Sequence, residues 1–177
     1  MRKKTEWITK TALMMALLVV LQAVTKSFGQ FVTGSCVNFI LALTVLICGL
    51  SSAVTVAVLS PFFAFMLGIG PAFLPIVPGI SVGNTLLVLV LYFLTKGKNE
   101  KSGLLKSAAA VIAAALVKFA ALYCLIVKII LPLLSLNEKQ TAVISASFSW
   151  PQLVTALIGS SLAVLIFPRL RKAIKAS

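Results

Sequence analysis

The chain of 177 residues contains no histidine and no aspartate, and its only acidic residues are Glu6, Glu100 and Glu138. Without these side chains, a Ser–His–Asp triad, a pair of catalytic aspartates or a histidine-containing metal cluster cannot be built. The three glutamates lie outside the apolar stretches, so no carboxylate is placed to relay protons across a membrane. We therefore expect no catalytic site, no metal site and no proton-coupled pump.

Other familiar motifs are also missing. The three cysteines, Cys36, Cys48 and Cys124, fall in apolar stretches without paired spacing, which argues against a disulfide framework. The nearest candidate for a phosphate-binding loop, residues 95–101, lacks the glycine spacing of a P-loop. The chain is therefore expected to hold no cofactor and to hydrolyse no ATP by itself.

What the chain has in excess is apolar surface. Hydrophobic residues make up 60% of it and charged residues 11%, against roughly 45–50% and about 25% in an average soluble domain. A core of this size cannot enclose so many apolar residues, so the remainder must face lipid. The net charge of +13 would suggest nucleic acid for a soluble domain, but in a membrane protein the basic residues report topology. We expect an integral membrane protein with no nucleic-acid partner.

Continuous apolar runs predict an all-α fold, because a membrane β-barrel would need alternating polarity. The first run is long and lacks a small-x-small cleavage site, so we interpret it as a retained span and not as a signal peptide. The prediction is a six-transmembrane-helix bundle forming a single membrane domain over residues 1–177. The expected helices cover residues 8–25, 35–50, 52–69, 76–95, 105–131 and 151–167.

The basic residues indicate the orientation of this bundle. Twelve of the sixteen Lys and Arg residues form three clusters. If residues 35–69 formed two spans, all three clusters would lie on the cytoplasmic side, whereas one span would place the second cluster outside. We therefore expect both termini inside the cell. The clusters are Arg2, Lys3, Lys4 and Lys10; Lys96, Lys98, Lys101 and Lys106; and Arg169, Arg171, Lys172 and Lys175.

One basic residue lies deep in a predicted span. Lys118 is twelve residues beyond Lys106, which places it roughly 18 Å along the helix from the inner interface. A lysine at the membrane centre costs on the order of 2.5–3.5 kcal/mol, and no predicted span offers a carboxylate to pair with it. Either a ligand supplies the counter-charge, or Lys118 bonds helix-end carbonyls or water.

Further polar residues gather near the outer ends of the second, fourth and sixth predicted helices. With the N-terminus inside, these three helices start at the outer face and direct the positive ends of their dipoles there, which favours anions. The alternatives are helix capping, for which residues 149–152 resemble a capping box, and interfacial anchoring by Trp150. The candidate substrate-binding residues are Lys118, Asn84, Gln152, Trp150, Asn38 and Gln30, with Ser81 close to the same region.

A pair of small residues marks the first predicted helix. Ala12 and Ala16 lie one turn apart, an arrangement that lets another helix approach closely in lipid. Packing within the bundle is the alternative reading. The pair is a candidate docking face for a membrane partner.

The size, topology, alanine pair and the stretches Gly29–Asn38 and Pro78–Asn84 together resemble the S components of energy-coupling factor (ECF) transporters. The resemblance implies a multi-pass protein of the bacterial plasma membrane that binds a substrate in its outer half, beneath the first external loop. It also implies that Ala12 and Ala16 dock on a transmembrane coupling protein, which itself binds two cytoplasmic ATPases. Transport by such S components is thought to involve toppling of the loaded protein in the membrane.

The resemblance also limits the substrate. The chain lacks the metal-ligating N-terminal segment of the nickel and cobalt branch, which leaves vitamins and related small organic compounds. Lys118 favours a compound with a carboxylate or phosphate. Two other classes remain open, a membrane scaffold without a small ligand and a solitary carrier.

Overall fold

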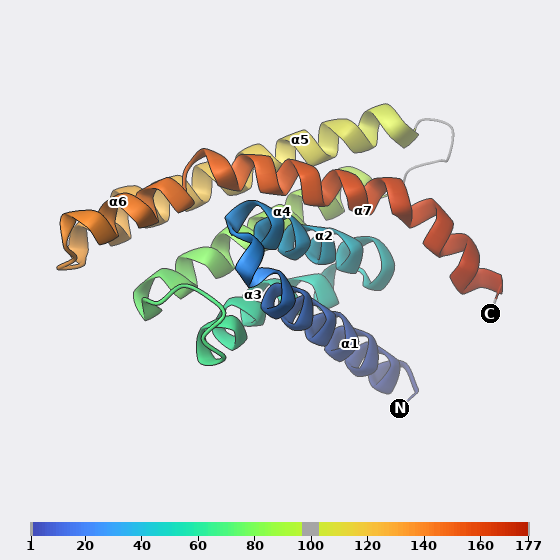
Figure 1. Cartoon of the computed structure of the whole chain (residues 1–177). Coiled ribbons are helices and arrows are strands. Elements are labelled where there is room, and N and C mark those ends of the chain that lie inside the picture. Colours follow the sequence, from blue (N-terminus) through green and yellow to red (C-terminus); the bar gives the residue numbers. More distant parts are fainter. Residues whose placement is uncertain (1, 97–102, 177) are drawn as a thin grey trace.

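The computed structural model describes residues 2–96 and 103–176, and these residues form helices and connections without a strand. The helices succeed one another along the chain and pack side by side (Figure 1). Short 3-10 turns, η1 (Lys26–Phe28), η2 (Leu74–Ile76) and η5 (Leu131–Leu133), stand at three of the connections, and a π-helix, η4 (Tyr123–Ile130), continues α5. The α-helices are α1 (Arg2–Thr25), α2 (Gln30–Cys48), α3 (Leu50–Met66), α4 (Val77–Thr95), α5 (Gly103–Leu122), α6 (Glu138–Ser147) and α7 (Trp150–Ala176).

Membrane-crossing length distinguishes these helices. Helix α3 is apolar but has 17 residues, fewer than the roughly 20 that cross a bilayer without thinning it. The expectation of an all-α membrane protein is confirmed. Five helical stretches of the described chain are long and apolar enough to span a membrane: Lys4–Phe28, Gln30–Cys48, Leu74–Thr95, Leu105–Leu133 and Glu138–Ala173.

Several boundaries differ from the predicted ones. Helix α2 begins at Gln30, five residues before the predicted start, because Gly29 turns the chain sharply at φ +85°. Helix α6 lies between the helices predicted over residues 105–131 and 151–167, and Asn137 and Gln140 form a capping box at its beginning. Residues 149–152 do not form one, since the Ser149 hydroxyl donates to the carbonyl of Ser145.

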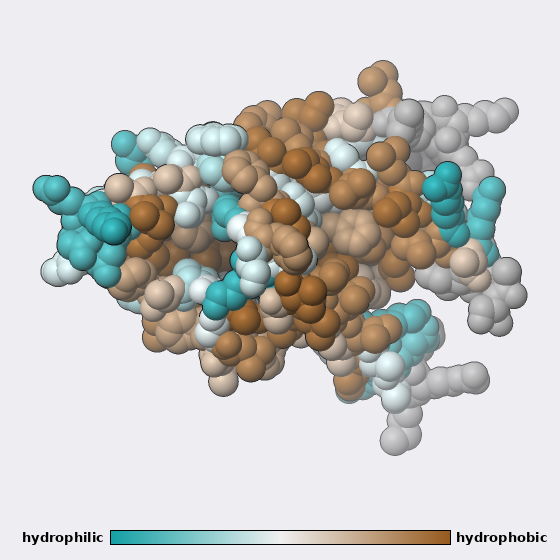
Figure 2. Space-filling view, in the orientation of Figure 1, coloured by the Kyte–Doolittle hydropathy of each residue, from teal (hydrophilic) through white to brown (hydrophobic). Residues whose placement is uncertain are grey.

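The basic clusters lie toward one end of the molecule. The beginning of α1, the end of α4, the beginning of α5 and the end of α7 all lie toward the right in Figure 1, and α6 lies at the opposite end. Hydrophilic residues gather mainly at these two ends, with apolar residues between them (Figure 2). Lys98 and Lys101 of the second cluster lie outside the described residues.

Glycines allow the central helices to pack closely. A Cβ atom at Gly159 of α7 would overlap the carbonyl oxygen of Ser35 in α2. Gly83 of α4 likewise faces Leu122 at the end of α5, where an added Cβ would come within 2.6 Å of that side chain. These contacts fix α2 against α7 and α4 against α5, and all four helices border one cavity.

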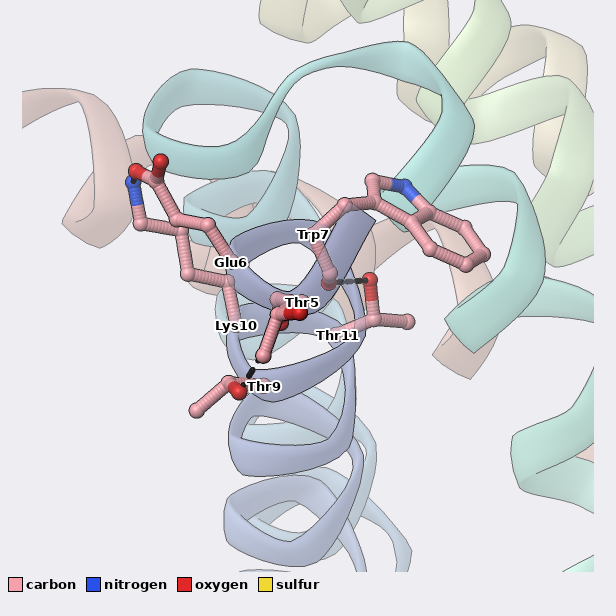
Figure 3. Close-up of polar contacts among 6 residues, drawn as sticks. All are labelled: Thr5, Glu6, Trp7, Thr9, Lys10 and Thr11. Carbon is pink, nitrogen blue, oxygen red and sulfur yellow. Dashed lines mark hydrogen bonds and ion pairs between the residues drawn. The ribbon is translucent and has the colours of Figure 1, made fainter. Parts of the chain in front are cut away.

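The beginning of α1 is fastened to the beginning of α3 by side-chain hydrogen bonds. The Thr11 hydroxyl lies 2.8 Å from the hydroxyl of Ser52, and the Trp7 indole donates to Ser51 at 3.0 Å. Figure 3 shows the local contacts of this segment, including the Thr11 hydroxyl bonded back to the carbonyl of Trp7. One face of α1 is therefore held against the bundle, while Ala12 and Ala16 are exposed.

Candidate functional site

A cavity of about 400 Å³ lies where six helices and three connections meet. This volume falls within the range of small-molecule sites. Its walls come from the α1–α2 connection, one face of α2, residues 69–73 of the α3–α4 connection, and residues of α1, α4, α5, α6 and α7. Apolar and aromatic side chains such as Phe73, Ile80 and Phe148 form much of the lining. Such a wall can hold an organic body, with specificity left to a few polar groups.

Lys118 of α5 is the central polar group of the cavity. Its side chain is only 3% exposed, and its ammonium donates to the side-chain oxygens of Asn38 and Asn84, each at 2.6 Å. Both acceptors are neutral amides, so they satisfy two of the three ammonium protons without neutralising the charge. Neither acceptor therefore gives Lys118 a negative counter-charge, and one donor of its ammonium remains at the wall of the cavity.

The two asparagines hold Lys118 from two different helices. Asn38 of α2 is fixed by its own amide, which donates to the carbonyl of Gly34 at 2.9 Å and to the Thr155 hydroxyl at 3.3 Å. Asn84 of α4 lines the cavity, and its amide nitrogen makes no hydrogen bond to the described part of the chain. Asn38 thus acts as a fixed acceptor, whereas Asn84 offers free donors beside the Lys118 ammonium.

Gln152 and Gln30 contribute further amides to the lining. Gln152 of α7 is 6% exposed, and its side-chain nitrogen donates to the carbonyl of Ser147 at 3.0 Å, which leaves its oxygen as an acceptor. Gln30, the first residue of α2, is exposed and lines the outer part of the cavity. Five of the six residues singled out from the sequence therefore border one cavity, namely Lys118, Asn84, Asn38, Gln152 and Gln30.

Trp150 and Ser81 lie elsewhere. Trp150 is 60% exposed and packs against Phe31 with a distance of 5.4 Å between ring centroids, outside the cavity lining. The Ser81 hydroxyl is turned away from the cavity and donates to the carbonyl of Val58 in α3 at 2.9 Å. Trp150 thus pairs the beginnings of α2 and α7, and Ser81 ties α4 to α3.

Sequence reasoning missed several lining residues. Lys26 lies in the α1–α2 connection and borders the cavity. Its position outside all three basic clusters was the sequence signal that could have singled it out. The aromatic residues Phe73 and Phe148 lie in connections whose path could not be read from the sequence.

A family model for the substrate-specific component of ECF transporters matches residues 7–171. The chain belongs to this family. No curated protein and no solved structure shows a significant similarity to it. The family assignment confirms the resemblance noted from the sequence.

The chain is therefore the substrate-binding subunit of an ECF importer and a multi-pass membrane protein. S components of this kind bind a small substrate and work with a membrane coupling protein and ATPases, and they are transport components and not enzymes. The cavity around Lys118 supplies the residues for a more specific proposal.

Proposed function

We propose that this S component captures a vitamin or related small organic compound that carries a carboxylate or phosphate, and that it delivers this compound into a bacterial cell across the plasma membrane. The proposal treats residues 1–177 as a single membrane domain with six crossings and both termini inside. Its substrate-binding residues are Lys118, Asn84, Asn38, Gln152 and Gln30, with Trp150 anchoring the rim. No metal or cofactor takes part.

The observation that carries this proposal is the environment of Lys118. A buried ammonium with two neutral acceptors at 2.6 Å is hydrogen-bonded but not charge-compensated. An acidic group of a ligand in the cavity would receive the remaining ammonium proton and the amide protons of Asn84, and it would supply the missing negative charge. Charge-assisted hydrogen bonds of this kind are about twice as strong as neutral ones.

The membrane partner is proposed to dock on α1. Ala12 and Ala16 are exposed one turn apart, and the hydrogen bonds of Thr11 and Trp7 to α3 keep that face directed away from the bundle. In lipid, close backbone packing is a main source of helix affinity, and two alanines permit it. This face therefore suits the transmembrane coupling protein, which brings the two ATPases.

The test compares ligand binding by the wild type and by Lys118→Ala. The protein in detergent is screened for thermal stabilisation by nicotinate, pantothenate, biotin, pyridoxal phosphate, riboflavin and thiamine, which cover anionic, neutral and cationic chemistry. We expect an anionic compound to stabilise the wild type most. By titration calorimetry, Lys118→Ala should bind that compound at least tenfold more weakly, a loss of about 1.4 kcal/mol.

Lys128→Ala provides the matched control. Lys128 lies over the Tyr123 ring, 5.4 Å from its centroid, and does not line the cavity. This variant should bind like the wild type. Wild-type affinity of Lys118→Ala, or stabilisation only by neutral or cationic compounds, would contradict an anionic substrate. A lack of stabilisation by every compound would favour a scaffold without a ligand.

A further inference from the structure

The distribution of basic residues singles out a second lysine at the cavity. Outside the three basic clusters the chain contains only Lys26, Lys118, Lys128 and Lys139. Two of these four, Lys26 and Lys118, line the same cavity. Lysines are disfavoured both inside the bilayer and in external segments near the spans, so this coincidence calls for a specific role.

Lys26 sits at the exposed side of the cavity. It belongs to the 3-10 turn η1 between α1 and α2, and its ammonium donates to the carbonyl of Gly68 in the α3–α4 connection at 2.6 Å. The five residues that follow Gly68 all line the cavity. Because this hydrogen bond uses one of the three N–H donors of the ammonium and the carbonyl carries no net charge, two further donors and the positive charge of Lys26 remain available.

No carboxylate of the described lining residues balances these two lysines. Glu6 is paired with Lys10 near the beginning of α1, and Glu138 lies in the first turn of α6 without bordering the cavity. Glu100 lies outside the described residues. The described wall therefore presents two lysines without a carboxylate partner, Lys118, which is 3% exposed, and Lys26, which is exposed.

Building on the proposed function, we propose that the substrate carries two acidic groups and that Lys26 binds the second one. The first group contacts Lys118 and Asn84 in the buried part of the cavity, and the organic body packs against Phe73 and Phe148. The second group faces Lys26 at the outer side, where it competes with or joins the Gly68 carbonyl. Lys26 is then a specificity residue that favours diacids over monoacids.

A purely structural role for Lys26 makes a different prediction. If its bond to Gly68 only holds the α3–α4 connection in place, loss of the ammonium lowers the affinity for every ligand by the same factor. If Lys26 binds a second acidic group, loss of the ammonium lowers the affinity for diacids and leaves the affinity for monoacids unchanged. The ratio of the two effects therefore separates the roles.

The experiment uses the immobilised full chain and a defined equimolar mixture of small carboxylic and phosphoric acids. Each compound with two acidic groups is paired with an analogue in which one acid is replaced by its amide or methyl ester. Retained compounds are eluted and quantified by mass spectrometry for the wild type, Lys26→Gln, Lys26→Arg and Lys118→Gln. Lys139→Gln, which removes an external charge away from the cavity, is the control.

The wild type should retain diacids at least tenfold better than their half-amides. Lys26→Gln should lose this preference for diacids while retaining the half-amides as the wild type does. Lys26→Arg should keep the preference. Lys118→Gln should retain neither diacids nor half-amides. Equal retention of diacids and half-amides by the wild type, or a uniform loss in Lys26→Gln, would overturn the role of Lys26 and leave the anionic substrate standing. If the wild type retains no acid at all, the proposed function itself fails.

Discussion

At the scale of single residues, the site depends on Lys118 having no carboxylate partner in the cavity. Lys118 is held by two amide oxygens, where a carboxylate would have formed a buried ion pair and removed the need for an anionic ligand. Replacing an amide by a carboxylate of the same shape therefore tests the charge and keeps the geometry.

We predict that Asn84→Asp abolishes the preference for an anion without unfolding the protein. The new carboxylate would occupy the place of an oxygen that already lies 2.6 Å from the Lys118 ammonium and would neutralise it. The melting temperature in detergent should stay equal to that of the wild type or rise. Affinity for the best anionic compound of the panel, measured by calorimetry, should fall at least tenfold.

Asn137→Asp is the control for this substitution. Asn137 is exposed, caps α6 away from the cavity, and can be replaced by aspartate without losing the cap. It should bind like the wild type. Unchanged anion affinity in Asn84→Asp would show that the charge of Lys118 does not face the ligand.

At the scale of elements, other helices cover much of α2 but leave α1 largely exposed. Helix α2 packs against α7 so closely that Gly159 has no room for a side chain, and seven of its residues are buried. Helix α1 is fixed at its beginning by Thr11 and Ser52, yet it leaves Leu13, Val20 and Val24 more than half exposed. A helix that is anchored and largely uncovered is suited to contact lipid and a membrane partner.

We predict that replacing both Ala12 and Ala16 by Trp separates binding from transport. The two indoles would keep a partner helix from approaching the backbone of α1. Binding of the anionic compound by the isolated protein should change less than twofold. Co-purification with the coupling protein and uptake in cells should be lost.

The control is a pair of exposed residues with the same spacing on another helix. Ile112 and Leu116 of α5 are 52% and 49% exposed, and their double Trp variant should support uptake. Wild-type uptake by the Ala12→Trp, Ala16→Trp variant would exclude docking on this face. Loss of ligand binding in the isolated variant would instead show that the alanines pack within the bundle.

At the scale of the whole molecule, the short helix α3 decides the topology. Five stretches are long enough to cross a membrane, and α3 has only 17 residues. If α3 also crosses, six crossings place both termini on one side, in agreement with the basic ends of α1 and α7 that lie toward the same end of the molecule (Figure 1). With five crossings the termini would lie on opposite sides.

We predict that single cysteines at Lys4 and Arg171 are both protected from a membrane-impermeant maleimide in intact cells, while one at Lys139 is labelled. The three native cysteines are first replaced by alanine. Opening the cells should expose the first two positions. Labelling of only one of the Lys4→Cys and Arg171→Cys variants in intact cells would contradict six crossings with both termini inside.

Composition and local pattern by themselves determined the class of this protein. The 60% hydrophobic content and the continuous apolar runs already required a helical membrane protein. Only helices and closed β-barrels satisfy the backbone in lipid, and a barrel would need alternating polarity. The family was also recognisable, from the stretches around Asn38 and Asn84 and the alanine pair. The helical rise alone predicted that Lys118 lies deep in its span.

Only the tertiary structure decided which of the polar residues share a cavity. Asn38, Asn84 and Lys118 are up to 80 residues apart in sequence and meet through helix crossings that glycines such as Gly159 and Gly83 permit. Trp150 and Ser81 had equally suitable positions, yet their side chains point elsewhere, since one packs on Phe31 and the other bonds Val58. Lys26 lines the cavity because the α1–α2 connection that carries it forms part of the wall. Sequence spacing fixes a residue's height in the bilayer, but the rotation and packing of helices fix the direction in which its side chain points.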